Sequence, residues 1–485
     1  MPEKWQPKLG DRIFRPRRIK RFRLRRVLGI PAVFSAGYGN VGSSIYYALG
    51  IVALVAMGAT PVALGLAGIL FIFTALTYAE GTAALPEAGG SASFARHGFG
   101  NTAGFLAGWA LMLSYIVTIS ISAYTIPPYL GFFWGPFKDS VVIGTATSMG
   151  LVFFLMVINV VGIRETSFIN IGATLIDILT QVSLVVIGFI LLFDPANIWR
   201  SMVNNWPSGE NLVLGIALAT IAYTGIETMS QMAEETKKPE RSVPRALVMM
   251  IVAVLVIFAG ISLVSLSAMT PQELATDWAR DPVAGIAFNL PVEMIRTVLE
   301  PLIAVLAGTI LLIATNAGLI GISRLAFSQG GHGLVPVVLR SVHSRFKTPY
   351  VSIIVFSLIA MALLIPGFFT TDVFTNMGAL YAVGSLLAFM FAHASIIGLR
   401  IRRPDMHRPF KLGMNIRIKG YEIPVSAVIG LIATTGIWII ILITEAYSRW
   451  LGLGWMVLGL VIYYLTRRRR RSPADEWKVK PRKII

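Results

Sequence analysis

The chain has 485 residues, of which 55% are hydrophobic and only 14% are charged, and its mean hydropathy is +0.72. A soluble globular domain carries about 25% charged residues, so this composition excludes an ordinary soluble fold. The formal net charge of +18 is concentrated in the tails and short loops, which argues against nucleic-acid binding. There are no cysteines, so a disulfide-linked partner subunit is excluded.

Apolar stretches of membrane-spanning length follow one another along the chain. A transmembrane helix needs about 20 mainly apolar residues, and twelve stretches meet this requirement. We therefore predict an all-α polytopic membrane protein with 12 transmembrane helices in one domain, residues 28–466, between basic tails at 1–27 and 467–485. The expected spans are approximately 28–56, 61–85, 102–130, 141–161, 167–193, 211–234, 244–268, 298–328, 349–369, 373–399, 422–445 and 450–466.

The basic residues are distributed unevenly between the two sides that this span count defines. Of the 42 Lys and Arg residues, only Lys138, Arg200, Arg280, Arg296 and Arg449 fall opposite the tails. An excess of Lys and Arg marks the cytoplasmic side of a membrane protein. We therefore expect both termini in the cytoplasm and the protein in the cell membrane. Basic tails attract anionic lipids, which we expect as partners there.

Two of the spans are interrupted by residues that break a membrane helix. Residues 37–44 (Gly-Tyr-Gly-Asn-Val-Gly-Ser-Ser) lie within the first span, and residues 222–227 (Ala-Tyr-Thr-Gly-Ile-Glu) lie within the sixth. Irregular backbone at membrane depth is tolerated only where it is buried in protein or lines a cavity. Interrupted helices in corresponding positions of two halves indicate the substrate site of a secondary transporter.

The two breaks suit opposite charges. In the first, a half-helix beginning near Ser43 would direct free N–H groups at an anion such as a carboxylate. Carbonyl groups near Gly225 in the sixth span would suit an ammonium group. The alternative for the glycines is a kink or a close helix-packing surface. The predicted substrate-binding residues are Gly39, Asn40, Gly42, Ser43, Ser44, Tyr115, Tyr223, Gly225, Glu227 and Asn316.

Acidic residues within apolar spans are costly and usually face a cavity or a partner. Glu227, at the sixth-span break, is expected to contact a substrate amine or to act as a proton-sensitive gate. Its alternative role is to cap unwound backbone. Asp177, in the fifth span, is expected to carry a coupling proton or to bind a cation, and its alternative is a polar network with Thr174 or Gln181. Tyr223 is expected to close over the substrate.

Several short motifs occur in order along the chain. They are residues 78–80 (Tyr-Ala-Glu), 85–91 (Leu-Pro-Glu-Ala-Gly-Gly-Ser), 104–109 (Gly-Phe-Leu-Ala-Gly-Trp), 159–165 (Asn-Val-Val-Gly-Ile-Arg-Glu), 223–227 (Tyr-Thr-Gly-Ile-Glu), 333–336 (Gly-Leu-Val-Pro) and 402–405 (Arg-Arg-Pro-Asp). As a set, they resemble the motifs of permeases of the amino acid–polyamine–organocation (APC) superfamily. The resemblance covers about residues 28–445.

This resemblance implies a LeuT-type fold with two inverted five-helix repeats, broken helices 1 and 6, and two peripheral helices. The repeats would be residues 28–193 and 211–399, followed by helices 11 and 12 in residues 422–466. Amino-acid permeases of the superfamily usually carry Gly-x-Gly in the first break, whereas this chain has Gly-Ser-Ser at 42–44. The Ser-Ser-x-x-Tyr pattern of Ser43, Ser44 and Tyr47 resembles the superfamily's potassium-uptake branch, so the identity of the substrate stays open.

Together these features predict a permease that moves an amino acid or a related amine by alternating access. Proton coupling is expected, with Na+ less favoured, and neither a cofactor nor a bound metal is expected. The nearest alternative is a symporter of potassium or another inorganic cation. The alternative of another class is a membrane nutrient sensor without transport. An enzyme is not expected, because the sequence has no paired acid/base or metal-ligand cluster.

Overall fold

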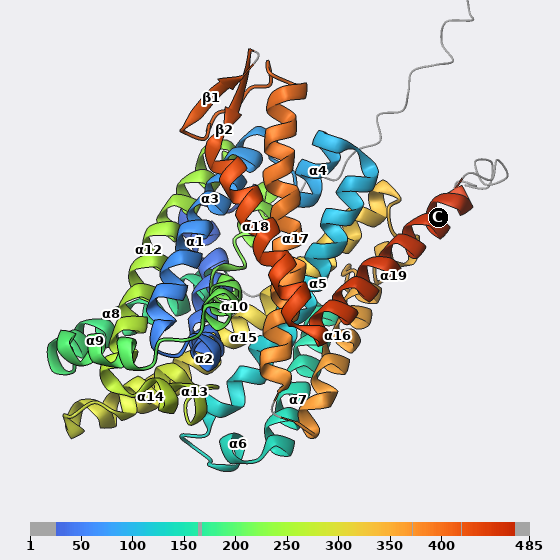
Figure 1. Ribbon diagram of the computed structural model, residues 1–485. Coiled ribbons are helices and arrows are strands. Elements are labelled where there is room, and N and C mark those ends of the chain that lie inside the picture. The colour runs from blue at the N-terminus through green and yellow to red at the C-terminus, as the bar shows by residue number, and fades with distance from the viewer. Residues whose placement is uncertain (1–25, 163–166, 371, 419, 471–485) are drawn as a thin grey trace, which may run out of the picture.

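The computed structural model describes residues 26–162, 167–370, 372–418 and 420–470. Most of these residues lie in helices, and many of the long helices run between the upper and lower ends of the molecule in Figure 1. The predicted basic tails, residues 1–27 and 467–485, lie largely outside the described residues, as does Arg164 in the loop expected after the fourth span.

The long helices agree closely with the predicted spans. They are α1 Ile30–Val41 with α2 Ile45–Ala56, α3 Thr60–Ala84, α5 Asn101–Leu130, α7 Val141–Val161, α8 Ser167–Leu191, α10 Gly209–Ala219 with α11 Glu227–Gln231, α12 Pro239–Ala268, α15 Glu293–His332, α16 Tyr350–Leu364, α17 Val373–Arg402, α18 Val425–Thr444 and α19 Ala446–Arg470.

By length and composition, 11 helical segments among the described residues could cross a membrane. One of them, Ile30–Ala84, has 55 residues, which at 1.5 Å per residue is about 80 Å of helix. The hydrocarbon core of a bilayer is only about 30 Å thick. This segment is interrupted at Met57, whose φ of 46° ends α2 before α3 begins at Thr60.

Short elements that the span prediction did not include connect the long helices. The short helices were not predicted because their apolar runs are shorter than a membrane span. A two-stranded antiparallel β-hairpin was also not predicted, so the expectation of a purely helical protein was incomplete. The short helices are α4 Ser91–Phe99, α6 Pro136–Asp139, α9 Pro195–Asn204, α13 Pro271–Thr276 and α14 Pro282–Phe288. The hairpin pairs β1 Asn415–Ile418 with β2 Tyr421–Pro424, with Ile416 opposite Ile423. Single 3-10 turns occupy Gly42–Ser44, Met57–Ala59, Thr220–Tyr223, Ala233–Glu235, Val337–Arg340 and Ile365–Phe368.

The most deeply buried helix is α5. Its side chains from Ala107 to Tyr129 are all buried, and α15 and α17 pack along it. The last helix, α19, is attached to α5 by Trp109 and Trp455, whose rings stack with centroids 4.6 Å apart. Each indole N–H donates to the backbone carbonyl of the other tryptophan. This contact holds α19 at the edge of the bundle, where it leans outward in Figure 1.

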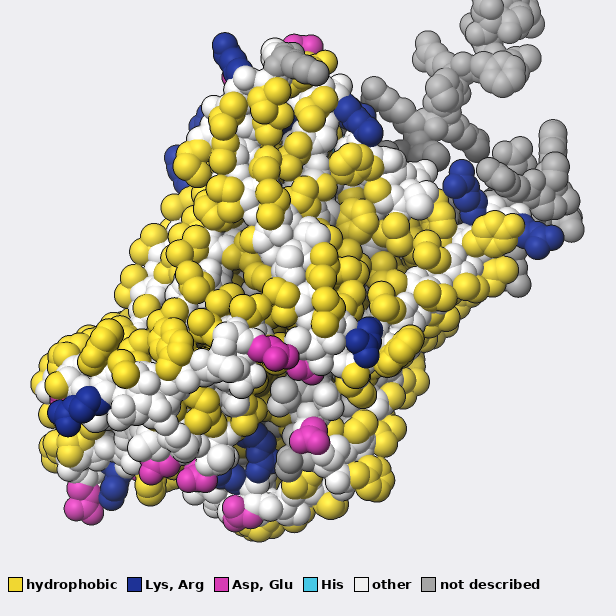
Figure 2. Space-filling view, in the orientation of Figure 1, with side chains coloured by type: hydrophobic (Ala, Val, Ile, Leu, Met, Phe, Trp, Pro, Cys, Tyr) yellow, Lys and Arg dark blue, Asp and Glu magenta, His cyan; other side chains and the backbone are white. Residues whose placement is uncertain are grey.

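The outer surface matches a protein surrounded by lipid. Figure 2 shows hydrophobic side chains over most of the middle of the visible face, with Lys, Arg, Asp and Glu gathered mainly toward its two ends. Large apolar side chains on α7 and α8 are more than half exposed, among them Phe153, Phe154 and Leu175. An exposed apolar surface of this extent marks contact with a membrane, so the chain is a multi-pass membrane protein.

The half-helix α2 is covered by the short helices α13 and α14. The turn between them approaches the backbone of α2 so closely that a Cβ at Gly50 would overlap the carbonyl oxygen of Ala279. Only a glycine at position 50 allows this contact, so the fit of α13 and α14 over α2 depends on it.

We expect Gly50→Ala to lower the free energy of unfolding by about 1–3 kcal/mol, because the added methyl group forces packed backbone apart. Thermal unfolding of the purified protein in detergent would measure the change. Gly436→Ala is the matched control, since a Cβ at Gly436 in α18 meets nothing within 4 Å. An equal effect of both substitutions would contradict this account.

Candidate substrate site

The chain between α10 and α11 is an open break within a membrane helix. Thr224 has extended backbone angles (φ −82°, ψ 159°), and Gly225 has a φ of +107°, which strongly favours glycine. Helical hydrogen bonding stops at Tyr223 and resumes at Glu227, so backbone polar groups are freed here. All of these residues are buried, so the break is enclosed by protein, as membrane depth requires.

Glu227 closes one end of this break. The backbone N–H of Gly225 donates to its Oε2 at 3.1 Å. Its other oxygen, Oε1, is fully buried and has no hydrogen-bond partner among the described residues. One oxygen therefore caps the unwound backbone, which is the structural role that the sequence left open, while the other is available to a ligand.

The first predicted break has a different form. Gly42–Ser44 is a single 3-10 turn, and Val41, Gly42 and Ser44 all keep right-handed helical angles. The hydroxyl groups of Ser43 and Ser44 donate to the Asn40 carbonyl at 3.1 and 3.2 Å. The second half-helix begins at Ile45 rather than near Ser43. The chain forms a tight 3-10 turn here instead of unwinding. The hydroxyl groups of Ser43 and Ser44 donate to the Asn40 carbonyl, which stabilises this turn.

The two interrupted helices meet at Asn40. Its side-chain amide donates to the Thr228 hydroxyl of α11 at 2.9 Å, and its Oδ1 has no partner within the described part of the chain. A Cβ at Gly225 would lie 2.8 Å from Asn40 Cγ, and one at Gly37 would meet the side chain of Met229. The absence of a side chain at Gly37 and Gly225 therefore allows close contact between α1 and the segment that leads into α11.

Further buried polar groups surround Glu227. The hydroxyl groups of Tyr78 in α3, Tyr115 in α5 and Tyr381 in α17 lie within electrostatic range of the Glu227 carboxylate. None makes a hydrogen bond of normal geometry among the described residues, but each interacts weakly with neighbouring hydroxyl groups, namely Ser91 for Tyr78, Thr228 for Tyr115, and Thr118 and Thr224 for Tyr381. Both side-chain polar atoms of Gln231 in α11 also lack partners among the described residues, and its Nε2 lies beside Gly90 in the loop before α4. Asn40, Tyr78, Tyr115, Glu227 and Tyr381 are called the Glu227 cluster below.

Buried polar groups without normal hydrogen bonds are unusual in proteins. Nearly all buried polar atoms in proteins are hydrogen-bonded, and an unpaired one costs free energy. The Glu227 cluster collects several of them from α1, α3, α5, α11 and α17 around one carboxylate. A small molecule with hydrogen-bond donors and a positive charge would satisfy these groups.

Asp177 in α8 forms a second buried polar site. Its Oδ1 accepts from the Tyr46 hydroxyl at 2.7 Å, and its Oδ2 accepts from the Gln181 amide at 2.6 Å. Tyr46 lies in α2, and its backbone carbonyl accepts from the Tyr129 hydroxyl of α5 at 2.8 Å. Of the two partners that the polar-network alternative named, Gln181 bonds the carboxylate, whereas the Thr174 hydroxyl bonds Ser35.

Several predicted residues lie elsewhere. Tyr223 turns its ring toward α3 and α12, and its hydroxyl donates to the Leu64 carbonyl at 2.8 Å, so it does not cover the Glu227 cluster. Asn316 accepts from the Asn159 amide of α7 at 2.6 Å. Gly39 packs against Ile313 of α15. The fold thus joins Asn40, Tyr115, Gly225 and Glu227 and adds two residues that the sequence prediction missed, namely Tyr78 and Tyr381.

A buried ion pair lies at the end of α3. The Arg400 guanidinium of α17 donates to both oxygens of Glu80, from Nε to Oε1 at 2.8 Å and from Nη2 to Oε2 at 2.5 Å. Both side chains are at most 2% exposed. The Leu412 N–H donates to Glu80 at 2.7 Å and Asn415 accepts from Arg400, so the pair ties the β-hairpin to the bundle.

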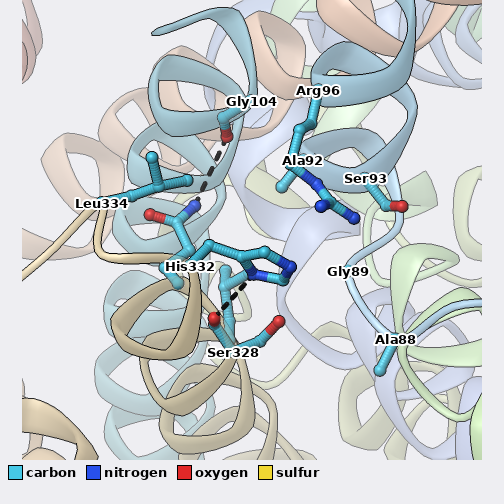
Figure 3. Close-up of a pocket in the computed structure, with 11 residues that line it drawn as sticks. Ala88, Gly89, Ala92, Ser93, Arg96, Gly104, Ser328, His332 and Leu334 are labelled. Atoms are coloured by element: carbon cyan, nitrogen blue, oxygen red, sulfur yellow. Dashed lines mark hydrogen bonds between the residues drawn. The ribbon is translucent and has the colours of Figure 1, made fainter. Parts of the chain in front are cut away.

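A small hollow at the same end lies between α4, α5 and α15 (Figure 3). Arg96 and Ser93 line it from α4, and His332 and Gln329 line it from α15. Arg96 is held by Glu87, in the loop before α4, at 2.6 Å. Hydrogen bonding from His97, together with the charge of Arg96, lowers the pKa of Glu87 to about 2. The cation of this hollow is thus already neutralised.

The fold and the Glu227 cluster define a polytopic membrane protein with a buried polar site at a helix break. Residues 28–465 match the family model described as amino acid permease. The chain belongs to this family of the APC superfamily, as its motifs predicted, and the family consists of membrane permeases rather than enzymes.

Relatives of known name align over most of the chain. A branched-chain amino acid permease of Bacillus subtilis is 26% identical over 463 residues, covering 92% of this chain and 94% of that protein. A methylthioribose transporter of the same organism is 26% identical, covering 88% of this chain and 90% of that protein. A low-affinity putrescine importer of Escherichia coli is 25% identical, covering 94% and 97%.

We expect Glu80→Gln to destabilise the protein by about 3–5 kcal/mol, because it leaves the Arg400 charge buried without a counter-charge. Unfolding in detergent, followed by intrinsic fluorescence, would measure this loss. Glu422→Gln is the control, since Glu422 pairs with Lys411 and Arg417 at the surface, where ion pairs contribute little. A Glu80→Gln protein as stable as the control variant would show that the buried pair is not a structural tie.

Proposed function

We propose that this protein is a secondary transporter of an amino acid or a related amine that works by alternating access. The observation that carries the proposal is the Glu227 cluster, in which buried polar atoms without normal hydrogen bonds surround a carboxylate at an open helix break. The names of the relatives support the substrate class, since they include an amino acid permease and a putrescine importer.

The charge of the cluster favours a substrate with an amine. Its one acidic side chain is Glu227, whose Oε1 is unpaired, and the other groups are tyrosine hydroxyls and the Asn40 amide, which accept as well as donate. An ammonium group of the substrate would donate to Glu227 Oε1 and to Asn40 Oδ1. In the structure, the serine hydroxyls at 43 and 44 are turned to the Asn40 carbonyl, so carboxylate binding on the α1 side would require them to turn away.

The same proposal includes the finer architecture. The interruption at Met57 supports counting Ile30–Ala84 as two crossings, which gives twelve. Residues 28–193 and 211–399 would be the two inverted repeats, whose first helices are α1–α2 and α10–α11, and α18 and α19 would be peripheral. An even number of crossings puts both termini on one side, and the excess of basic residues there supports a cytoplasmic orientation in the cell membrane.

Asp177 is the proposed site of proton coupling. The Tyr46 hydroxyl links it to α2, in the same interrupted helix pair that carries Asn40. Protonation would weaken the hydrogen bond from Tyr46, because a neutral carboxyl is a poorer acceptor than a carboxylate. The charge state of Asp177 would thereby bias the position of the interrupted helix that borders the substrate. Sodium coupling is the less favoured form of this proposal.

Uptake by purified protein in liposomes tests the function directly. A panel of labelled amino acids, polyamines, methylthioribose and rubidium would be supplied with and without an inward proton gradient. We expect accumulation of one class of amino acid or amine. Rubidium uptake without any organic substrate would replace the proposal by inorganic cation symport, and binding without flux would indicate a sensor.

We expect Glu227→Gln to lower kcat/KM for the amine substrate about 10-fold to 100-fold, since a hydrogen bond to a charged group contributes about 1.5–3 kcal/mol. Glutamine still accepts from the Gly225 N–H, so the helix cap is retained. Glu445→Gln, between α18 and α19, is the control and should transport at the normal rate. Normal uptake by Glu227→Gln would remove Glu227 from the substrate site.

We expect Asp177→Asn to abolish the response of uptake to the proton gradient while substrate exchange continues, because asparagine still accepts from Tyr46 but does not titrate. Uptake over a range of internal and external pH, compared with counterflow at equal pH, separates the two effects. Unchanged gradient dependence would exclude Asp177 as the coupling group.

A further inference from the structure

A cavity of about 200 Å³ lies between α3 and α12, away from the Glu227 cluster. The two helices pack side by side along their lengths (Figure 1). The small residues Gly65 on α3 and Ala259 on α12 border this space, whereas Gly68 is packed closely by Leu255 and Tyr223. A Cβ at Gly65 would meet nothing within 4 Å. The lining residues are Leu64, Gly65, Gly68, Ile69, Ile72, Tyr223, Leu255 and Ala259.

The mouth of the cavity opens on the lipid-facing surface. Ile69 at its edge is 51% exposed, and Val252 and Val256 beside it on α12 are 59% and 64% exposed. Both helices are apolar enough to cross the membrane, and the cavity lies within their spans. Its surroundings are therefore the acyl-chain region of the bilayer rather than water.

The inner wall of the cavity is Tyr223. Its ring stacks on Phe71 and packs against Phe258, with centroids 5.2 and 5.5 Å away. Its hydroxyl already donates to the Leu64 carbonyl. A stable buried water needs two to four polar partners, and the lining side chains offer no other polar group. An apolar occupant suits this cavity, whereas water does not.

We propose that this cavity binds one acyl chain of a membrane phospholipid. An unfilled hollow forfeits dispersion contacts along its lining, and a flexible alkyl chain entering from the bilayer restores them. The chain would lie against Tyr223, the residue immediately before the open backbone at Thr224 and Gly225. A bound acyl chain would thus pack against Tyr223 from the lipid side and limit the movement of the backbone at the helix break. The site itself does not depend on which substrate is carried.

Photo-crosslinking tests the site. The protein would be reconstituted in liposomes containing a phosphatidylcholine with a diazirine in one acyl chain, and labelled peptides would be mapped by mass spectrometry. We expect residues 64–72 and 255–259 to be labelled more strongly than other lipid-facing helices. Labelling no stronger than on α7 would overturn the proposal, as would labelling by a photoreactive free fatty acid but not by the phospholipid.

Gly65→Phe should fill the cavity and reduce its labelling several-fold, without disturbing the fold, because position 65 faces open space. Gly150→Phe on α7 is the matched control, since Gly150 is also exposed and a Cβ there also meets nothing within 4 Å. Undiminished labelling of residues 255–259 in Gly65→Phe would overturn the assignment. This readout needs no transport, so it stands apart from any failure of the proposed function.

A functional readout accompanies the labelling. We expect the uptake rate of the wild-type protein to vary with the length and unsaturation of the phospholipid chains, and that of Gly65→Phe to vary less. Gly150→Phe should keep the wild-type dependence. If the uptake rate of Gly65→Phe depends on acyl-chain composition as strongly as that of the wild type, then the bound acyl chain does not stabilise the helix break.

Discussion

The arrangement of the site depends on one constraint, which is that open backbone at membrane depth must be satisfied by protein. The chain opens at Thr224 and Gly225, and the Gly225 N–H is satisfied by the carboxylate of Glu227 two residues later. The acidic side chain of Glu227 is thereby held in the buried interior of the bundle. The surrounding helices place further polar side chains around it, among them Asn40 and Tyr115, and several of these make no hydrogen bond of normal geometry among the described residues. The side chain that satisfies the open backbone is thus also the acidic group of the proposed substrate site.

Glu227 and Asp177 are connected through one interrupted helix pair. Asn40 in α1 contacts Thr228 beside the break, and Tyr46 in α2 donates to Asp177. The 3-10 turn at Gly42–Ser44 lies between these contacts. A change in the tilt of α2 relative to α1 at this turn would alter both contacts together. Substrate binding at Glu227 and protonation at Asp177 would therefore act on the same element, which is the physical basis of coupling in the proposed mechanism.

Much of the fold was predictable from local patterns. The predicted spans agree with the observed helices to within a few residues, since each span is defined by the length of its own apolar run. The short helices α13 and α14 and the β-hairpin were missed because they are stabilised by contacts with distant segments, such as Ala279 on Gly50 and Leu412 on Glu80. The first break was predicted as unwound, but the hydroxyl groups of Ser43 and Ser44 keep it helical.

The sequence by itself determined the membrane class, the family and the positions of the breaks, because apolar length, glycine content and motif order are local properties. Only the tertiary structure decided which polar groups meet. It placed Tyr78 and Tyr381 near Glu227, joined Tyr46 to Asp177 across 131 positions, and turned Tyr223 toward a lipid-facing cavity. These pairings depend on the rotation and packing of whole helices, since a helix places side chains on every face and only its neighbours determine what each face contacts.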